Sequence, residues 1–279
     1  MKQRREFLKK MGVLTAVSML PSYLASAAPK KIKEIGVQLY TFRKGMESGD
    51  PKGTLKLISE LGINQIESAS SRFGLFYGLT AKEMKQTCKD LGMTLRSGHC
   101  NISTNWESTV EQAAESGQEY LISSGMPIKG QTVDTYKRAA EMFNKAGEDC
   151  KKAGIKFGYH NHASEFQSEG GQVFYDVLLQ NTDPKYVGFE MDLGWVVAGG
   201  KDPFKYFEDY KGRFPLWHLK DMKGTRSTEF GTGDLDITRL LKARKEAGLK
   251  YFFIEQEEYT ESPLASMKIN MAYLQNLNL

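Results

Sequence analysis

The chain has 279 residues, with 38 basic and 34 acidic side chains, four histidines and three cysteines. Five of the basic residues and one acidic residue lie within residues 1–27, so the rest of the chain carries 33 of each and no net charge. This balance excludes an electrostatic affinity for nucleic acid or for anionic membranes. The cysteines are far apart and form no CxxC pair, which argues against a disulfide framework or a cysteine-based zinc site.

Residues 1–27 have the features of a secretory signal. Arg4 and Arg5 precede a lysine-rich stretch, an apolar run of about 14 residues and the small-residue segment Ala-Ser-Ala at 25–27. The run is shorter than the ~20 residues that cross a bilayer, and the paired arginines resemble a twin-arginine signal. We therefore expect a periplasmic mature protein, residues 28–279, without stable membrane association. An amphipathic N-terminal helix is the alternative.

Short apolar segments rich in β-forming residues recur about every 26–36 residues in the remaining chain. Charged segments with helical spacing separate them, and glycines stand where several of the predicted helices end. Eight such units predict one domain of the α/β class, a (β/α)8 TIM barrel. A doubly wound open sheet is the alternative, but no glycine-rich phosphate loop follows the first strand. The predicted strands are 35–40, 63–68, 93–99, 119–124, 155–160, 187–192, 215–220 and 251–256.

The predicted strands end on residues that carry chemistry. Functional side chains of a TIM barrel lie at the C-terminal ends of its strands, and all four histidines lie at or within two residues of such an end. Alternation along a strand directs Glu190 and Asp192 into the barrel. By the same count, His218 shares a face with Lys220, and Glu255 shares one with Glu257. We therefore expect imidazoles and carboxylates to meet at the barrel mouth.

A mixed set of nitrogen and oxygen donors suits a divalent transition metal better than Mg²⁺ or Ca²⁺. We expect one ion, Mn²⁺ first, with Zn²⁺, Fe²⁺ and Co²⁺ as alternatives. Single residues of this kind also have structural explanations, because an aspartate after a strand often caps the next helix; we assign Asp221 and Asp234 to that role. The predicted ligands are His160, with His162 as the alternative on the same strand, Asp192, His218 and Glu255.

Five segments in the second half resemble the xylose-isomerase-like TIM barrel superfamily, and within it the sugar phosphate isomerase/epimerase group and inosose dehydratase. In chain order they are GYHNHASEF, VGFEMDLGWVVAGGKDP, WHLKDMK, FGTGDLDI and YFFIEQEE. The resemblance implies a divalent metal at the barrel mouth, with Asp192, His218 and Glu255 at ligand positions. The epimerases of this group have a glutamate on the fifth strand, where this chain has His160. Their symmetric pair of carboxylates is therefore not expected here.

Such a site predicts chemistry through an enediolate. The metal would act as a Lewis acid when a proton is removed next to a carbonyl, with Glu255 or Glu257 as base. His160 or His162 is the candidate acid. Lys220 would stabilise negative charge on oxygen, or would form an ion pair with Glu190.

Two reactions share this intermediate. Reprotonation gives an isomerase or epimerase, which the composition of the broader group favours. Loss of a β-oxygen gives a dehydratase or lyase acting on a keto-sugar, keto-glycoside or inosose. A non-catalytic exported sugar-binding barrel is the alternative of another class.

The expected partner is a small carbohydrate. Sugar phosphates are scarce outside the cytoplasm, so we expect an unphosphorylated sugar or keto-sugar, although the glycines of FGTGDLD offer a weak candidate phosphate cradle. The rather apolar loop 70–80 also suggests a subunit of a larger assembly, for example a homo-oligomer. The candidate substrate-binding residues are His99, His162, Arg72 and Trp195, with Tyr40, Phe42, Phe73, Phe76 and Trp106 as further aromatic candidates.

Overall fold

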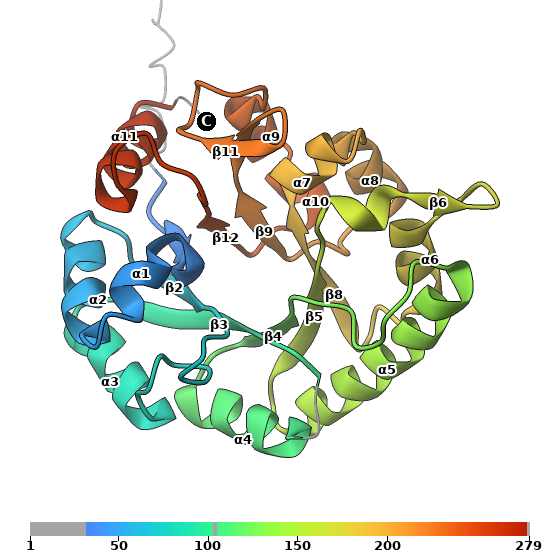
Figure 1. Cartoon of the computed structure of the whole chain (residues 1–279), viewed down its shortest axis with the longest axis horizontal. Coiled ribbons are helices and arrows are strands. Elements are labelled where there is room, and N and C mark those ends of the chain that lie inside the picture. The colour runs from blue at the N-terminus through green and yellow to red at the C-terminus, as the bar shows by residue number, and fades with distance from the viewer. Residues whose placement is uncertain (1–31, 103–104, 278–279) are drawn as a thin grey trace, which may run out of the picture. The chain divides into compact units, whose positions relative to one another are not determined.

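The computed structural model describes residues 32–102 and 105–277, which form a closed barrel of eight parallel strands. Helices surround the strands in Figure 1. This architecture confirms the predicted (β/α)8 barrel, and each of the eight predicted segments overlaps a barrel strand. In barrel order the strands are β1 (Gly36–Gln38), β12 (Tyr251–Ile254), β9 (Leu216–Leu219), β8 (Val187–Asp192), β5 (Lys156–His160), β4 (Tyr120–Ser123), β3 (Thr94–Cys100) and β2 (Gln65–Ser68).

The predicted secretory signal lies outside the described residues. Within the described ranges, we find no helix that combines the length and the apolar character of a membrane span.

The helices begin and end where local sequence signals predict. The Asp50 side chain caps α2, and Thr80 and Glu83 form a capping box at the start of α3. Gly62 and Gly154 follow α2 and α5 with φ of 84° and 80°, a left-handed conformation that glycine adopts without strain. The helices are η2 (Leu39–Phe42), α1 (Arg43–Met46), α2 (Pro51–Glu60), α3 (Ala81–Asp90), α4 (Trp106–Ser116), α5 (Val133–Lys152), η3 (Ala163–Phe166), α6 (Phe174–Asn181), α7 (Leu193–Ala198), α8 (Pro203–Asp209), α9 (Ile237–Lys242), α10 (Arg244–Ala247) and α11 (Pro263–Gln275).

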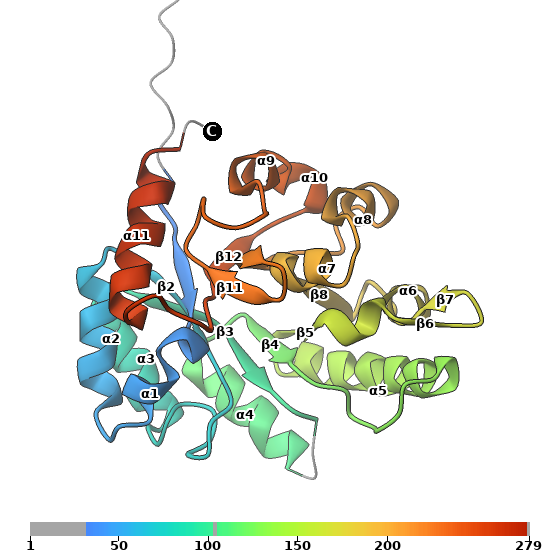
Figure 2. The same cartoon turned by 45° about the horizontal axis from the view of Figure 1, so that its top comes forward.

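Two short antiparallel hairpins interrupt the β/α alternation: β6 (Ser168–Glu169) with β7 (Gln172–Val173), and β10 (Asp221–Lys223) with β11 (Arg226–Thr228). The second hairpin lies beside α7 in Figure 2. The Ser227 hydroxyl accepts the backbone N–H groups of Glu257 and Glu258 at 2.8 and 3.0 Å. The hairpin therefore supports the segment that follows β12.

Asp221 holds the glycine-rich loop after β9 rather than capping a helix. Its carboxylate accepts the backbone N–H groups of Gly231, Gly233 and Leu235 at 2.9, 3.1 and 3.1 Å. The expected helix cap is therefore wrong for Asp221, and also for Asp234, whose carboxylate accepts the backbone N–H of Gly224 while Asp236 caps the next helix. The loop amides that a phosphate cradle would require are already bonded within the chain.

An apolar layer fills the barrel below its mouth. Tyr120, Ile122, Leu216 and Phe253 form a buried cluster inside the strands, separate from the core between strands and helices. A Cβ on Gly36 would lie 2.5 Å from the Phe253 ring, so only glycine leaves this ring its space. The layer is therefore a packed floor beneath the polar mouth.

The replacement Phe253→Ala tests this floor. Phe253 is fully buried, so its removal should lower the free energy of unfolding by about 3–5 kcal/mol through lost burial and a residual cavity. Urea unfolding measures the change. Leu57→Ala, at a side chain that is 49% exposed, is the control and should change stability by no more than about 0.5 kcal/mol. Equal effects of the two replacements would contradict the packed floor.

Candidate metal centre

Four side chains meet at the C-terminal ends of neighbouring strands. They come from the end of β5, the end of β8, the middle of β9 and the residue after β12, and their donor atoms all lie within 4.8 Å of one another. The His160 Nε2 and His218 Nδ1 atoms are 3.0 Å apart, and Glu255 Oε2 is 2.9 Å from the same His218 nitrogen. We call this buried set the upper cluster: His160, Asp192, His218 and Glu255.

The donor chemistry of the upper cluster fits a divalent transition metal. Two imidazole nitrogens and two carboxylate oxygens form the mixed set that Mn²⁺, Fe²⁺, Co²⁺ and Zn²⁺ accept. Burial lowers the pKa of His160, and the neighbouring His218 lowers it further. His160 is therefore neutral, which is the form of histidine that binds a metal.

Asp192 uses its two carboxylate oxygens differently. Oδ1 accepts the backbone N–H of Trp195 at 2.9 Å and so caps α7. Oδ2 faces the upper cluster, 3.5 Å from His160 Nε2. The helix-cap and metal-ligand interpretations of this aspartate are therefore compatible.

Lys220 lies among carboxylates, and its partners differ from the predicted one. Its Nζ is 2.8 Å from Asp192 Oδ2, 2.7 Å from Glu255 Oε2 and 2.8 Å from Glu257 Oε1. The alternative of an ion pair with Glu190 is wrong, because Glu190 turns instead toward two histidines. Burial by itself lowers the pKa of Lys220, but the three carboxylates outweigh it and raise this pKa above its usual range.

The carboxylates of the upper cluster stay ionised despite their burial. Desolvation raises the pKa of Glu255, but the ammonium of Lys220 and the ring of His218 together hold it well below its usual range. Lys220 has the same effect on the pKa of Asp192. Both carboxylates are therefore anionic and able to bind a cation.

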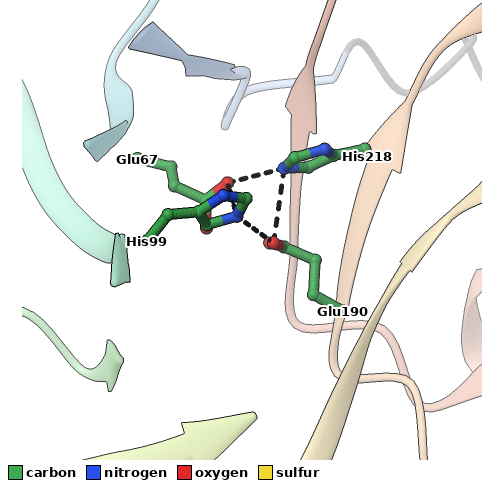
Figure 3. Close-up of side chains that lie close together, drawn as sticks. All are labelled: Glu67, His99, Glu190 and His218. Atoms are coloured by element: carbon green, nitrogen blue, oxygen red, sulfur yellow. Dashed lines mark hydrogen bonds and ion pairs between the residues drawn. The ribbon is translucent and has the colours of Figure 1, made fainter. Parts of the chain in front are cut away.

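A second buried set lies directly beside the upper cluster and shares His218 with it. We call Glu67, His99, Glu190 and His218 the lower cluster, and Figure 3 shows its side chains pointing toward one another from β2, β3, β8 and β9. His99 Nε2 is 2.6 Å from Glu190 Oε2, and His218 Nε2 is 2.7 Å from Glu67 Oε1. Burial and the charge of Glu67 raise the pKa of Glu190 to about 8. The pKa of His99 rises to about 9, because Glu67 and Glu190 outweigh the opposing effect of its burial.

A cavity of about 310 Å³ opens above the two clusters. His162 and Trp195 are part of its lining, together with Glu257, whose side chain is 28% exposed. The predicted substrate-binding residues His99, His162 and Trp195 therefore meet at one opening. The full lining is Tyr40, Ala69, Ser70, His99, Asn101, Ser124, His160, His162, Trp195, Glu255 and Glu257.

Arg72 lies elsewhere. Its side chain is 70% exposed, is 3.6 Å from Glu47 and stacks on Phe73, and it does not line the cavity.

Sequence reasoning also overlooked Glu67 as a member of the site. A charged residue inside the apolar segment INQIES was the available signal, because an acidic side chain in a barrel strand requires a buried partner.

Comparison with known proteins identifies the family. The model of the family described as xylose isomerase-like TIM barrel matches residues 55–277. The chain belongs to this family. An inosose dehydratase from Clostridium perfringens is 27% identical over 241 residues, which cover 77% of this chain and 78% of the relative.

Two solved structures extend the comparison. A sugar phosphate isomerase/epimerase from Parabacteroides distasonis is 29% identical with a TM-score of 0.78, covering 92% of this chain and 98% of that one. The IolI protein with a binding zinc atom has a TM-score of 0.68 at 13% identity, covering 86% and 95% of the two chains, and so shares the fold.

Elemental mass spectrometry of the purified protein tests the upper cluster. We expect about one divalent transition metal per chain, and its loss in Asp192→Asn and His218→Ala, because each change removes one of the four converging donors. His162→Asn is the matched control, since His162 lies at the same strand end but outside the cluster. Full metal content in a folded Asp192→Asn variant would contradict the assignment.

Proposed function

We propose that this protein is a metal-dependent enzyme that dehydrates an unphosphorylated keto-sugar, keto-glycoside or inosose by removing a proton next to a carbonyl and expelling a β-hydroxyl. The observation that carries the proposal is the placement of acid and base groups. Of the described residues that line the cavity, Glu257 and His162 are ionisable and lie outside both clusters. They follow β12 and β5, which are three strands apart around the barrel.

Glu257 is positioned to act as the base. Lys220 Nζ donates to its Oε1 at 2.8 Å, and the Ser227 hydroxyl accepts its backbone N–H at 2.8 Å. These contacts hold the carboxylate at the cavity wall while part of its side chain remains accessible. A fixed and accessible carboxylate can remove a proton from a bound substrate.

His162 is positioned to act as the acid. Its ring lies edge-on to the ring of His160, and the two ring centres are 4.9 Å apart. The distance from the centre of the His162 ring to that of the Trp195 indole is 6.2 Å. A departing hydroxyl needs a proton in order to leave as water. An imidazole is a side chain that can donate a proton near neutral pH.

The proposed reaction needs both groups. Glu257 takes the proton from the carbon next to the carbonyl, which leaves an enolate, and the carbon–carbon double bond then forms when the carbon–oxygen bond to the β-hydroxyl breaks. His162 gives its proton to that hydroxyl, which leaves as water. The metal, when held by the upper cluster, supplies a Lewis acid that polarises the carbonyl. The inosose dehydratases among the relatives support elimination.

Isomerisation or epimerisation is the second candidate, and the likeness to the Parabacteroides distasonis protein favours it. Its first step is the same removal of a proton by Glu257. The reactions diverge when the substrate is reprotonated instead of losing its hydroxyl.

We propose Mn²⁺ as the metal, and the zinc atom in the IolI protein supports Zn²⁺ as the alternative.

A panel of keto-sugars, keto-glycosides and inososes in deuterated water tests the proposal with metal-loaded protein. We expect a carbon-bound proton of the substrate to exchange with deuterium, which NMR detects. We also expect a product lighter than the substrate by one water, which mass spectrometry detects. Glu257→Gln should slow both processes by about 10²–10⁴-fold, because it removes the base. His162→Asn should retain exchange and lose dehydration, because it removes only the acid.

Arg72→Gln is the matched control and should leave both rates unchanged, since this side chain lies outside the cavity. A deuterated product of unchanged composition would replace the proposal with the isomerase or epimerase. The absence of exchange with every compound would leave a sugar-binding barrel.

We also propose that the protein acts in the periplasm, on the basis of the twin-arginine-type sequence at residues 1–27. Fractionation of cells that produce the full chain tests this: retention in the cytoplasm would contradict it, and loss of export in an Arg4→Lys, Arg5→Lys variant would support it.

A further inference from the structure

His218 has two ring nitrogens, and each faces a different cluster. Nδ1 faces the upper cluster, 2.9 Å from Glu255 Oε2 and 3.0 Å from His160 Nε2. Nε2 faces the lower cluster, 2.7 Å from Glu67 Oε1 and 3.3 Å from Glu190 Oε2. The ring is fully buried, so water does not compete for either nitrogen.

A histidine that binds a metal must present a lone pair to it. A neutral imidazole has one lone pair and one N–H, so binding through Nδ1 requires the proton on Nε2. The nearest acceptor for that proton is Glu67 Oε1. A carboxylate in this position fixes both the tautomer and the orientation of a metal-binding ring.

Glu67 is itself held in place. The Gln38 side chain donates from Nε2 to Glu67 Oε1 at 2.8 Å, and His99 Nε2 lies 3.4 Å from the same oxygen. His99 in turn is bonded to Glu190 (Figure 3). Glu67 is fully buried, and a hydrogen bond to a buried carboxylate is stronger than one exposed to water.

We propose that Glu67 is a positioning residue that keeps the proton of His218 on Nε2 and directs the Nδ1 lone pair to the metal. The inference rests on the metal centre of the proposed function and adds the device that prepares one of its ligands. It gives the lower cluster a role as a hydrogen-bonded support rather than as a second metal site.

The distances favour support over a second ion. Ligands about 2.1 Å from an ion are separated by about 3.0–3.4 Å in octahedral or tetrahedral sites. The contacts of the upper cluster span 2.9–3.6 Å. Those of the lower cluster span 2.6–3.4 Å, and its two shortest contacts, at 2.6 and 2.7 Å, are charge-assisted hydrogen-bond lengths, below the separation of two ligands on one ion. Within the described residues, Glu67 Oε2 and Glu190 Oε1 have no hydrogen-bond partner, so the experiment must also detect a second ion.

Zinc affinity, measured by competition with a chelator, tests the proposal without relying on activity. We expect Glu67→Gln, which removes the charge but keeps the shape, to weaken zinc binding about 10-fold, and Glu67→Ala about 100-fold. Glu229→Gln is the matched control: Glu229 is a buried carboxylate bonded to Ser266 and Thr260, away from His218. It should leave zinc affinity unchanged.

NMR of the zinc-loaded protein gives a second measurement, and four histidines make selective labelling practical. We expect a low-field, slowly exchanging Nε2 proton on His218 that moves upfield in Glu67→Gln, because a neutral amide is a weaker acceptor. Wild-type affinity in both Glu67 variants would overturn the inference while leaving the metal centre intact. Two zinc ions per chain, one of them lost in Glu67→Gln, would also overturn it. No zinc in the wild-type protein would instead reject the metal centre.

Discussion

Buried charge is the constraint on which the upper half of this barrel depends. Acidic side chains enter the interior from β2, β8 and the end of β12, where removal from water costs several kcal/mol per ion unless a partner compensates. Strand register supplies one of the partners, since Asp192 lies opposite His218 on the neighbouring strand. Lys220 neutralises the carboxylates nearest the opening. Shifting any of these strands by one residue would leave unpaired charges in the interior.

The same constraint accounts for the division of the interior into layers. Apolar side chains fill the barrel below, and the lower cluster joins β2, β3, β8 and β9 through histidine–carboxylate contacts. The upper cluster lies nearer the cavity, and Glu257 and His162 line the wall beyond it. Solvent access therefore increases toward the opening, while the groups suited to hold an ion are buried.

Much of the architecture could be predicted from the sequence. The periodic apolar segments gave all eight barrel strands, and alternation along β8 and β9 correctly directed Asp192 and His218 inward, because the period of two is a local property of extended backbone. The partner of Lys220 could not be predicted in this way. The partners come from the end of β8 and from the segment after β12, and a long side chain reaches several positions that strand order alone leaves open. Glu67 was overlooked because its partners are 29 to 151 residues away in sequence.

Asp192 connects the first turn of α7 with the upper cluster. One of its oxygens fixes the first turn of α7, which places the indole of Trp195 on the cavity wall, and the other faces the buried donors. The geometry of the upper cluster and the shape of the cavity above it therefore both depend on a single carboxylate. A replacement at Trp195 would therefore have to preserve the backbone of α7, since a displaced first turn would break the bond from the Trp195 N–H to Asp192 and turn this carboxylate within the upper cluster.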